Sequence, residues 1–242
     1  MNYIIKQKEK SICKIIKNGI PIGTGFLCNI SGHSRRRKAL ITAYHVLGEE
    51  DLKIGNIIKI TFDDNNKKIK IIKIDNKRYI YASEENDITI IEIIDSDNLK
   101  NYNYLEIDES IYNDTDFNKN YKNKNIYIFH YPNGLLSSFS VNIYIKIDKE
   151  DIIYHLCSTE IGSSGSPILS LDTFKVIGIH LGSGNFDKDI FKNEINLKQL
   201  LFNKDHFIFC NYGRIIKKPI SNFNIKDNKI ILNLKIDKND IC

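Results

Sequence analysis

The feature that most constrains the fold is a series of short strand-like segments along most of the chain. These segments are rich in β-branched residues or alternate apolar with polar residues, and they cover residues 11–19, 23–30, 38–46, 57–62, 67–75, 87–94, 125–131, 139–148, 152–159, 166–171 and 175–182. Turn residues separate them, as in "DDNN" and "YPNG". A period of two residues is typical of strands, whereas helical periodicity is weak before residues 194–203. The sequence therefore predicts an all-β protein, with a barrel or sandwich favoured over strand–helix units.

The 242 residues are enough to bury the core of one large β domain or of two small ones. A long polar stretch at residues 107–125 divides the strand-like segments into two groups, and we interpret it as the connection between two β halves. The residues after 205 contain a few more strand-like pieces and no motif. We therefore expect residues 206–242 to be a C-terminal extension of unknown role.

Composition and cysteine usage exclude several classes of protein. The chain is 42% hydrophobic and 27% charged, as is usual for soluble globular proteins, and Lys, Asn or Asp interrupts each apolar run before it could span a membrane. No secretory signal is expected at the N-terminus. The five cysteines are scattered and contain no CxxC pair, which argues against a disulfide scaffold and a zinc site: Cys13, Cys28, Cys157, Cys210 and Cys242. We expect a cytoplasmic, reducing location, no membrane partner, and no metal or other cofactor.

The net charge of +5 raises the question of a nucleic-acid partner. The one compact basic run is "SRRRK" at residues 34–38, which lies between two strand-like segments and fits a solvated hairpin loop. Nucleic-acid-binding surfaces combine basic residues with aromatic platforms or a recognisable binding fold, and neither accompanies this run. We therefore expect no nucleic-acid partner, although a nucleic-acid-binding β domain stays open as an alternative.

The stretch "GSSGSP" at residues 162–167 contains more small residues than a simple turn requires. A serine hydroxyl becomes a good nucleophile only when a base takes its proton and an acid orients that base. His45 stands at the end of the segment "LITAYH", and Asp87 stands directly before the segment "ITIIEI". Both positions are strand ends, where side chains meet at a barrel rim.

Other acidic residues of the same half compete with Asp87, but Asp87 alone immediately precedes a "DIxII" strand; the competitors are Asp63, Asp64, Asp75, Glu84 and Glu85. Structural or exposed roles are expected for most of the other histidines, namely His33, His130, His155 and His206.

Five ordered pieces, "GTGFLC", "ALITAYHV", "NDITIIEI", "GSSGSPIL" and "VIGIHLG", resemble the motifs of trypsin-like serine proteases of the chymotrypsin fold. The resemblance covers about residues 11 to 203. It is strongest to intracellular, disulfide-free members and to bacterial glutamyl endopeptidases. It implies a double six-stranded β-barrel with a C-terminal helix at 194–203. The implied domain is 1–205, with barrels at about 11–100 and 108–186, and its partner is a protein or peptide substrate.

The resemblance also assigns roles to residues of the catalytic motifs. In the "GxSGxP" frame the nucleophile is Ser164, with His45 as general base and Asp87 as the acid that orients it. The backbone N–H groups of Gly162 and Ser164 would form the oxyanion hole. Ser163 and Ser166 would be small fillers.

The resemblance also implies that a second group of residues determines substrate choice. His180 lies in the strand that lines the primary specificity (S1) pocket of the family, Ser158 matches the pocket base, and Thr159 matches a hydroxyl that faces the substrate. None carries a fixed negative charge, so a Lys or Arg side chain would have no partner, provided that Glu160 points to solvent. Cleavage after Glu or Gln is the resulting prediction. The alternative, in which His180 is a packed strand histidine, stays open.

One position departs from the pattern of secreted trypsins. Those enzymes carry an aspartate just before the nucleophile, where a newly cut N-terminal amine binds it, and this chain has Ser163 there. We therefore expect an enzyme that is competent as translated, or one that is gated by other means. A catalytically silent fold that binds proteins is the alternative function, and the oligomeric state is left open.

Overall fold

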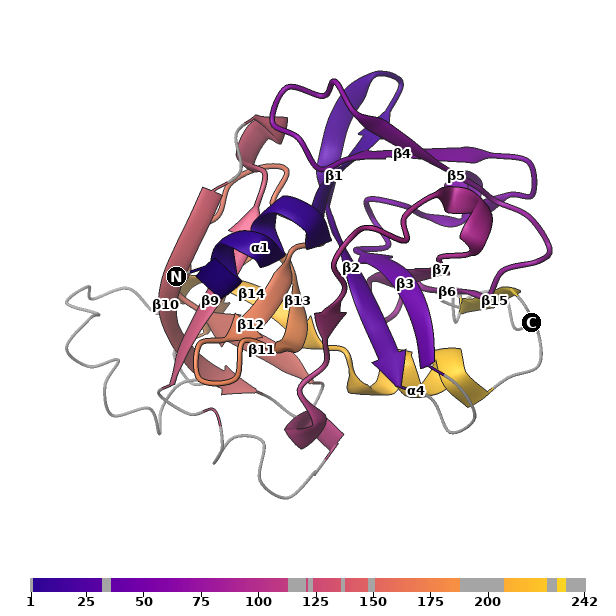
Figure 1. Cartoon of the computed structure of the whole chain (residues 1–242). Coiled ribbons are helices and arrows are strands. Elements are labelled where there is room, and N and C mark those ends of the chain that lie inside the picture. Colours follow the sequence, from indigo (N-terminus) through magenta and orange to yellow (C-terminus); the bar gives the residue numbers. More distant parts are fainter. Residues whose placement is uncertain are drawn as a thin grey trace.

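The computed structural model describes residues 2–31, 36–112, 121, 124–135, 138–147, 151–187, 207–225 and 230–233, and the account below concerns these residues. Two β-sheets make up most of the regular structure (Figure 1). The first is built mainly from the N-terminal half of the chain and the second from the C-terminal half. This arrangement confirms the all-β class with two barrel-like halves.

The first sheet has nine strands in the order β15-β6-β7-β3-β2-β1-β4-β5, with β8 paired to β2. Its strands are β1 (Ile12–Lys17), β2 (Ile20–Ser31), β3 (Arg36–Thr42), β4 (Ile57–Thr61), β5 (Ile69–Lys73), β6 (Ile80–Ser83), β7 (Ile88–Glu92), β8 (Leu105–Glu106) and β15 (Ile230–Asn233). The sheet departs from the expected six strands partly because β8 and β15 add in parallel to β2 and β6. In the described chain its hydrogen-bonded path ends at β5 and β15 and does not close.

The second sheet is a closed barrel in the order β10-β11-β14-β13-β12-β9. Its strands are β9 (Asn125–His130), β10 (Ser138–Ile147), β11 (Ile152–His155), β12 (Pro167–Ser170), β13 (Val176–Asp187) and β14 (Phe207–Ile215). The sixth strand, β14, comes from the range that the sequence analysis assigned to a C-terminal extension. It pairs with both β11 and β13, so the barrel closes through it.

Two α-helices of the described residues stand outside the sheets. Helix α1 (Asn2–Ser11) precedes β1, and Gln7 on this helix bonds the Phe174 carbonyl at 2.8 Å. Helix α4 (Lys217–Ile225) follows β14 and leads to β15, so the chain returns from the second barrel to the first sheet (Figure 1). The helix expected at residues 194–203 lies outside the described residues. Neither helix has the length and hydropathy needed to cross a membrane.

The basic run at residues 34–38 is described only from Arg36 onward. Arg37 donates to the Phe223 carbonyl at 3.1 Å, and its guanidinium stacks 4.0 Å from the centre of the Tyr79 ring. This residue therefore fastens α4 to the first sheet, and its charge is engaged within the fold.

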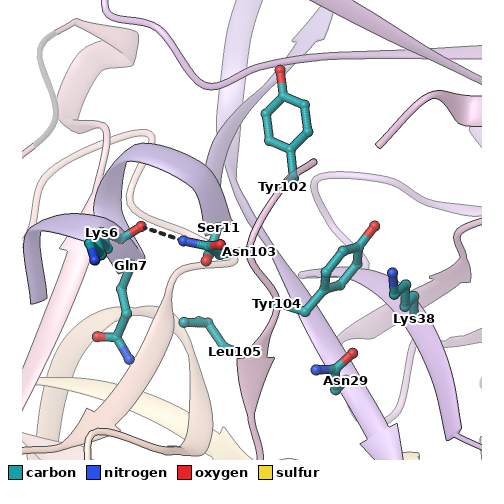
Figure 2. Close-up of a pocket in the computed structure, with 9 residues that line it drawn as sticks. All are labelled: Lys6, Gln7, Ser11, Asn29, Lys38, Tyr102, Asn103, Tyr104 and Leu105. Carbon is teal, nitrogen blue, oxygen red and sulfur yellow. Dashed lines mark hydrogen bonds between the residues drawn. The ribbon is translucent and has the colours of Figure 1, made fainter. Parts of the chain in front are cut away.

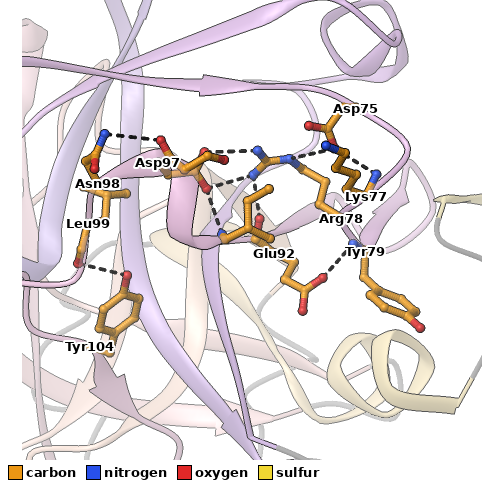
Figure 3. A network of polar contacts seen from close by, with 11 residues as sticks. Asp75, Lys77, Arg78, Tyr79, Glu92, Asp97, Asn98, Leu99 and Tyr104 are labelled. Atoms are coloured by element: carbon orange, nitrogen blue, oxygen red, sulfur yellow. Dashed lines mark hydrogen bonds and ion pairs between the residues drawn. The ribbon is translucent and has the colours of Figure 1, made fainter.

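Most of the described apolar interior forms one large cluster that extends through both sheets. A polar network stands within the first half: the fully buried Arg78 places two nitrogens 3.0 Å from the two carboxylate oxygens of Asp97 and donates to the Glu92 carbonyl at 2.8 Å (Figure 3). Loss of either partner of such a bidentate pair is costly, because the remaining charge would be buried without water or a counter-ion. It ties the end of β7 to the loop that follows.

Candidate active site

The structure brings His45 and Asp87 into direct contact. His45 Nδ1 lies 2.7 Å from Asp87 Oδ2, and the His45 backbone N–H donates to Asp87 Oδ1 at 3.0 Å. The two residues meet because β3 and β7 are antiparallel neighbours, with Thr42 opposite Thr89. Two contacts to one carboxylate fix both the backbone and the ring of His45, and they favour the tautomer with the proton on Nδ1.

Local structure directs these two side chains outward. The buried Val46 and Leu47 anchor the turn after β3, while the His45 side chain is 47% exposed. Asp87 closes a turn before β7 with a φ of +48°, a left-handed conformation that Asp tolerates better than most residues. That backbone conformation places the carboxylate beside the histidine at the rim.

The serine-rich turn that joins β11 to β12 is fastened to both halves of the molecule. Thr24 of β2 donates its backbone N–H to the Ser164 carbonyl at 2.9 Å and its hydroxyl to the Gly162 carbonyl at 2.8 Å. Gly165 donates to the His180 carbonyl at 2.8 Å. The turn therefore lies at the junction of the first sheet and the second barrel, on elements that fix its backbone.

Two glycines of this turn have backbone conformations that side chains rarely adopt. Gly162 has a φ of +90°, and a Cβ there would lie 2.8 Å from the Tyr131 carbonyl oxygen. Gly165 has a φ of +89°, and a Cβ there would collide with the Thr24 carbonyl and the Thr42 hydroxyl. Both positions therefore require glycine, which explains the two glycines of the "GSSGSP" motif.

The Ser164 hydroxyl points toward β13. Its Oγ donates to the Leu181 carbonyl at 3.0 Å, and this is its one hydrogen bond within the described part of the chain. The candidate nucleophile is thus on the same turn as the candidate oxyanion donors, while its hydroxyl is engaged by a backbone acceptor and not by His45.

The backbone donors of the turn divide into two groups. The N–H groups of Ser163, Gly165 and Ser166 are bonded to the carbonyls of Glu160, His180 and Ser163. The N–H groups of Gly162 and Ser164 donate to no described carbonyl or side chain. Unused donors side by side on a fixed turn are the elements of an anion-binding site, and the sequence analysis expected the oxyanion hole at these two positions.

Ser163 has a structural role that the sequence analysis did not assign. Its buried Oγ lies 2.7 Å from His130 Nδ1 and accepts the Glu160 backbone N–H at 3.0 Å. Burial lowers the pKa of His130, so the ring is neutral near pH 7. This uncharged pair stands at the position just before the candidate nucleophile.

His180 is buried on β13, with 2% of its surface exposed. Its Nδ1 lies 3.2 Å from Nε2 of His155, which is also fully buried. Burial, and then the nearby His155, hold the pKa of His180 well below its ordinary value, and burial lowers the pKa of His155 to about 3. Both rings are therefore neutral at pH 7.

The other two expected specificity residues make contacts of their own. Thr159 donates its hydroxyl to Asn211 Oδ1 at 2.6 Å, and Asn211 in turn donates to the Cys157 carbonyl at 2.6 Å. Ser158 is exposed, so it does not form a buried floor. Glu160 is exposed and accepts a hydrogen bond from the Asn133 side chain at 2.8 Å, in agreement with the expectation that it faces solvent.

Sequence reasoning missed three contributors: Thr24, His130 and Asn211. Thr24 lies in the "GTGFLC" segment, whose serine partner is 140 residues away, so no local pattern could reveal the contact. Asn211 lies on β14, in a range that carried no motif. A polar residue within the strand-like "FIFCNYG" was the only available signal.

The two barrel-like halves with this rim site define the chymotrypsin-like class of fold. Comparison with protein families matches the trypsin-like peptidase domain over residues 23–179. The match covers well over half of the chain, and the chain therefore belongs to the trypsin-like peptidase family. As a member of that family it is a serine endopeptidase.

Solved structures share the fold at low sequence identity. A structure of Deg5 superposes with a TM-score of 0.57 at 14% identity, covering 94% of this chain and 95% of that one. A serine endoprotease from Yersinia pestis gives a TM-score of 0.56 at 11% identity, covering 91% of this chain and 66% of that one. No curated protein gives a sequence match to this chain. At such identities the likeness concerns the fold alone.

Proposed function

We propose that the chain cleaves peptide bonds through a triad of Ser164, His45 and Asp87. The observation that carries the proposal is the double contact of His45 with Asp87, at 2.7 Å and 3.0 Å. It leaves His45 Nε2 as the basic nitrogen of the Nδ1-protonated tautomer. A histidine oriented in this way can take the serine proton and return it to the leaving amine, while the carboxylate stabilises the imidazolium.

The reaction begins with a rotation of the nucleophile. Ser164 Oγ leaves the Leu181 carbonyl and turns toward His45 Nε2, at a cost of about 1 kcal/mol for the lost hydrogen bond. Its oxygen then attacks the substrate carbonyl as His45 accepts the proton. The N–H groups of Gly162 and Ser164 bind the developing oxyanion of the tetrahedral intermediate. Collapse of this intermediate releases the amine and leaves an acyl-enzyme, which water then hydrolyses.

For substrate choice we propose cleavage after Gln or Glu, with the pocket bounded by His180, Thr159 and Asn211. Among the described residues, no carboxylate is bonded to any of these three groups. A buried ammonium would therefore be left unpaired. Because burial lowers the pKa of His180, its ring is neutral at pH 7, which favours the uncharged amide of Gln. Discrimination against side chains that cannot form such hydrogen bonds can reach about 10⁴.

We also infer that the enzyme works in a reducing, cytoplasmic compartment. Cys13, Cys28, Cys157 and Cys210 are free and buried in the described structure. Burial raises the pKa of Cys157 and of Cys210 to about 12. Such thiols stay protonated at pH 7 and unreactive. Thiol reductants should therefore change neither the activity nor the melting temperature.

A digest of a proteome-derived peptide library tests both activity and specificity. Wild-type protein should cut, and the Ser164→Ala variant, whose melting temperature should match the wild type, should not. The cut sites should follow Gln or Glu. Cleavage after Lys, Arg or large aromatic residues would overturn the pocket assignment while leaving the triad. A folded wild-type protein that cuts nothing would instead favour the alternative of a catalytically silent binding module.

A further inference from the structure

Two exposed asparagines each fasten one segment of the chain to another with both the backbone N–H and the side-chain amide. Asn103 donates its backbone N–H to the Lys10 carbonyl at 3.1 Å and its amide to the Lys6 carbonyl at 3.3 Å (Figure 2). This α1 clamp holds the helix to the segment before β8. Asn133 forms a similar pair at the serine turn, where its backbone N–H donates to the Ile161 carbonyl at 2.6 Å.

The second bond of Asn133 joins the same two segments through side chains. Its Nδ2 donates to Glu160 Oε2 at 2.8 Å. We call the two bonds from Asn133 the serine-turn clamp. A carboxylate in place of the amide would face the Glu160 carboxylate at this short distance, and the repulsion would separate the two segments.

The backbone that carries Asn133 is fixed in place. Asn133 lies in the short turn η4 (Pro132–Gly134) with a φ of +51°, a left-handed conformation that Asn adopts more readily than most residues. Gly134 donates its N–H to the Tyr131 carbonyl at 3.0 Å, and the buried Tyr131 donates its own N–H to Thr24 Oγ1 at 3.1 Å. The Asn133 N–H therefore points at the serine turn from an anchored position.

The segment held by the clamp is a β-turn at residues 160–163. The Ser163 N–H donates to the Glu160 carbonyl at 3.0 Å and closes this turn. Its third residue, Gly162, has a φ of +90°, as in a type II turn. Turns of types I and II differ by a near half-rotation of the central peptide, which here joins Ile161 to Gly162. This peptide therefore has two orientations, and the Gly162 N–H points in opposite directions in the two.

The bond from Asn133 selects one of these orientations. The C=O and N–H of a trans peptide point in opposite directions. With the Ile161 carbonyl turned toward Asn133, the Gly162 N–H points away from η4, and it donates to no described carbonyl or side chain. A rotated peptide would present the Ile161 oxygen in its place, and that oxygen would repel a developing oxyanion.

We propose that Asn133 is a positioning residue for the oxyanion hole, because its clamp holds the Ile161–Gly162 peptide with the Gly162 N–H available to the substrate. The inference rests on the proposed function, which gives Gly162 its role as an oxyanion donor. Since the oxyanion forms only in the transition state, opening of the clamp lowers kcat and leaves KM nearly unchanged.

Asn133→Asp places a second carboxylate opposite Glu160. Loss of one oxyanion donor lowers kcat by about 10²–10³, and an opened clamp should lower it by about fivefold or more, with KM within about twofold of wild type. The exchange variant Asn133→Asp/Glu160→Gln restores the amide–carboxylate bond with the donor and the acceptor exchanged. Its kcat should return to within about threefold of that of Glu160→Gln alone.

Asn103→Asp is the matched control, because it makes the same change of charge in the α1 clamp. It should keep wild-type kcat even where its melting temperature falls. An equal loss of kcat in Asn103→Asp and Asn133→Asp would mean that general loosening of the fold is the cause, and it would overturn the proposal. Wild-type kcat in Asn133→Asp, or no recovery in the exchange variant, would also overturn it.

Hydrogen exchange of the residue-133 backbone amide gives a readout that needs no catalysis. Measured by NMR in the Ser164→Ala background and corrected for intrinsic rates, this amide should be protected, should lose protection in Asn133→Asp and should regain it in the exchange variant. An unprotected amide before substitution, or equal protection after it, overturns the proposal. A folded wild type that cuts no peptide contradicts the proposed function instead, and the exchange rates still decide whether Asn133 holds the peptide.

Discussion

His130 Nδ1 lies 2.7 Å from Oγ of Ser163, the residue just before the candidate nucleophile. Because Ser163 Oγ also accepts the Glu160 N–H at 3.0 Å, one hydroxyl holds the end of β9 to the start of the serine turn. The sequence analysis compared this position with the aspartate that secreted trypsins carry there, which binds a newly cut N-terminal amine. Here a neutral pair takes its place, and it needs no chain cleavage to form.

Removal of the Ser163 hydroxyl should weaken catalysis. Ser163→Ala leaves a ring nitrogen and a backbone N–H without partners, at a cost of about 1–3 kcal/mol each, and it loosens the turn that carries the oxyanion donors. We expect kcat/KM to fall by about tenfold or more. The exposed Ser96→Ala is the control and should have wild-type kinetics. Equal kcat/KM for the two variants would show that the His130 contact does not position the turn.

The Asp87 carboxylate should matter far more than its neighbours. Asp87→Asn keeps the shape of the side chain but removes the charge that orients His45 and stabilises its protonated form, so kcat/KM should fall by about 10³–10⁴. Glu85→Gln, in the same turn and exposed, is the matched control and should retain activity. Steady-state kinetics on one peptide substrate measures kcat/KM for both variants. A decrease in kcat/KM of less than about tenfold for Asp87→Asn would mean that another residue is the acid that orients His45.

Acid should destabilise the protein through its buried histidines. The pKa values of His130, His155 and His180 are lowered by burial from 6.5, that of His155 to about 3. Above pH 6.5 these rings are neutral in both the folded and the unfolded chain and have no effect. Below it the unfolded chain binds protons that the folded chain does not, so the free energy of unfolding decreases as pH falls.

For His155 the window is from pH 6.5 to about 3. In that window its contribution has a slope of about 1.4 kcal/mol per pH unit. Urea denaturation between pH 8 and 5 measures it. His155→Gln should reduce the slope of the free energy of unfolding against pH below pH 6.5 and leave that slope unchanged above pH 6.5. A variant curve parallel to the wild type throughout would mean that His155 titrates normally in the folded protein.

The buried pair of Arg78 and Asp97 offers a stability test with an internal control. Asp97→Asn leaves the buried guanidinium with only a 4.0 Å contact to the carboxylate of Asp75, and it should reduce the free energy of unfolding by about 3–5 kcal/mol. Asp95 lies two residues earlier and pairs with Lys100 at 3.3 Å, where the two side chains are 89% and 68% exposed. Asp95→Asn should therefore cost less than about 1 kcal/mol. Similar midpoints in urea for both variants would contradict the account of this network.

Those parts of the fold and site that follow from local pattern were predictable. The alternating segments revealed the strands, and the positions of His45 and Asp87 at strand ends were readable because each adjoins an apolar run. Helix α1 was missed, since its "NYIIKQKEK" lacks a clear apolar stripe. The role of β14 was missed because nothing in "FIFCNYG" indicates which barrel needs a sixth strand.

Contacts between distant residues were out of reach for the same reason. The pairing of Ser163 with His130 depends on where β9 ends relative to the serine turn, and a single sequence carries no record of that register. The exposure of Ser158 and the burial of His180 likewise depend on how β13 and the preceding turn are placed in the barrel.

The central claim is that Ser164, and no other serine of the turn, is the nucleophile. Reaction with a fluorophosphonate followed by peptide mass spectrometry tests it most directly, because the reagent needs only an activated hydroxyl and an oxyanion site, whatever the substrate. The account predicts one adduct per chain, on Ser164, that is lost in Ser164→Ala and strongly reduced in Asp87→Asn. An adduct on Ser163 or Ser166, or a folded protein that stays unlabelled, would contradict it.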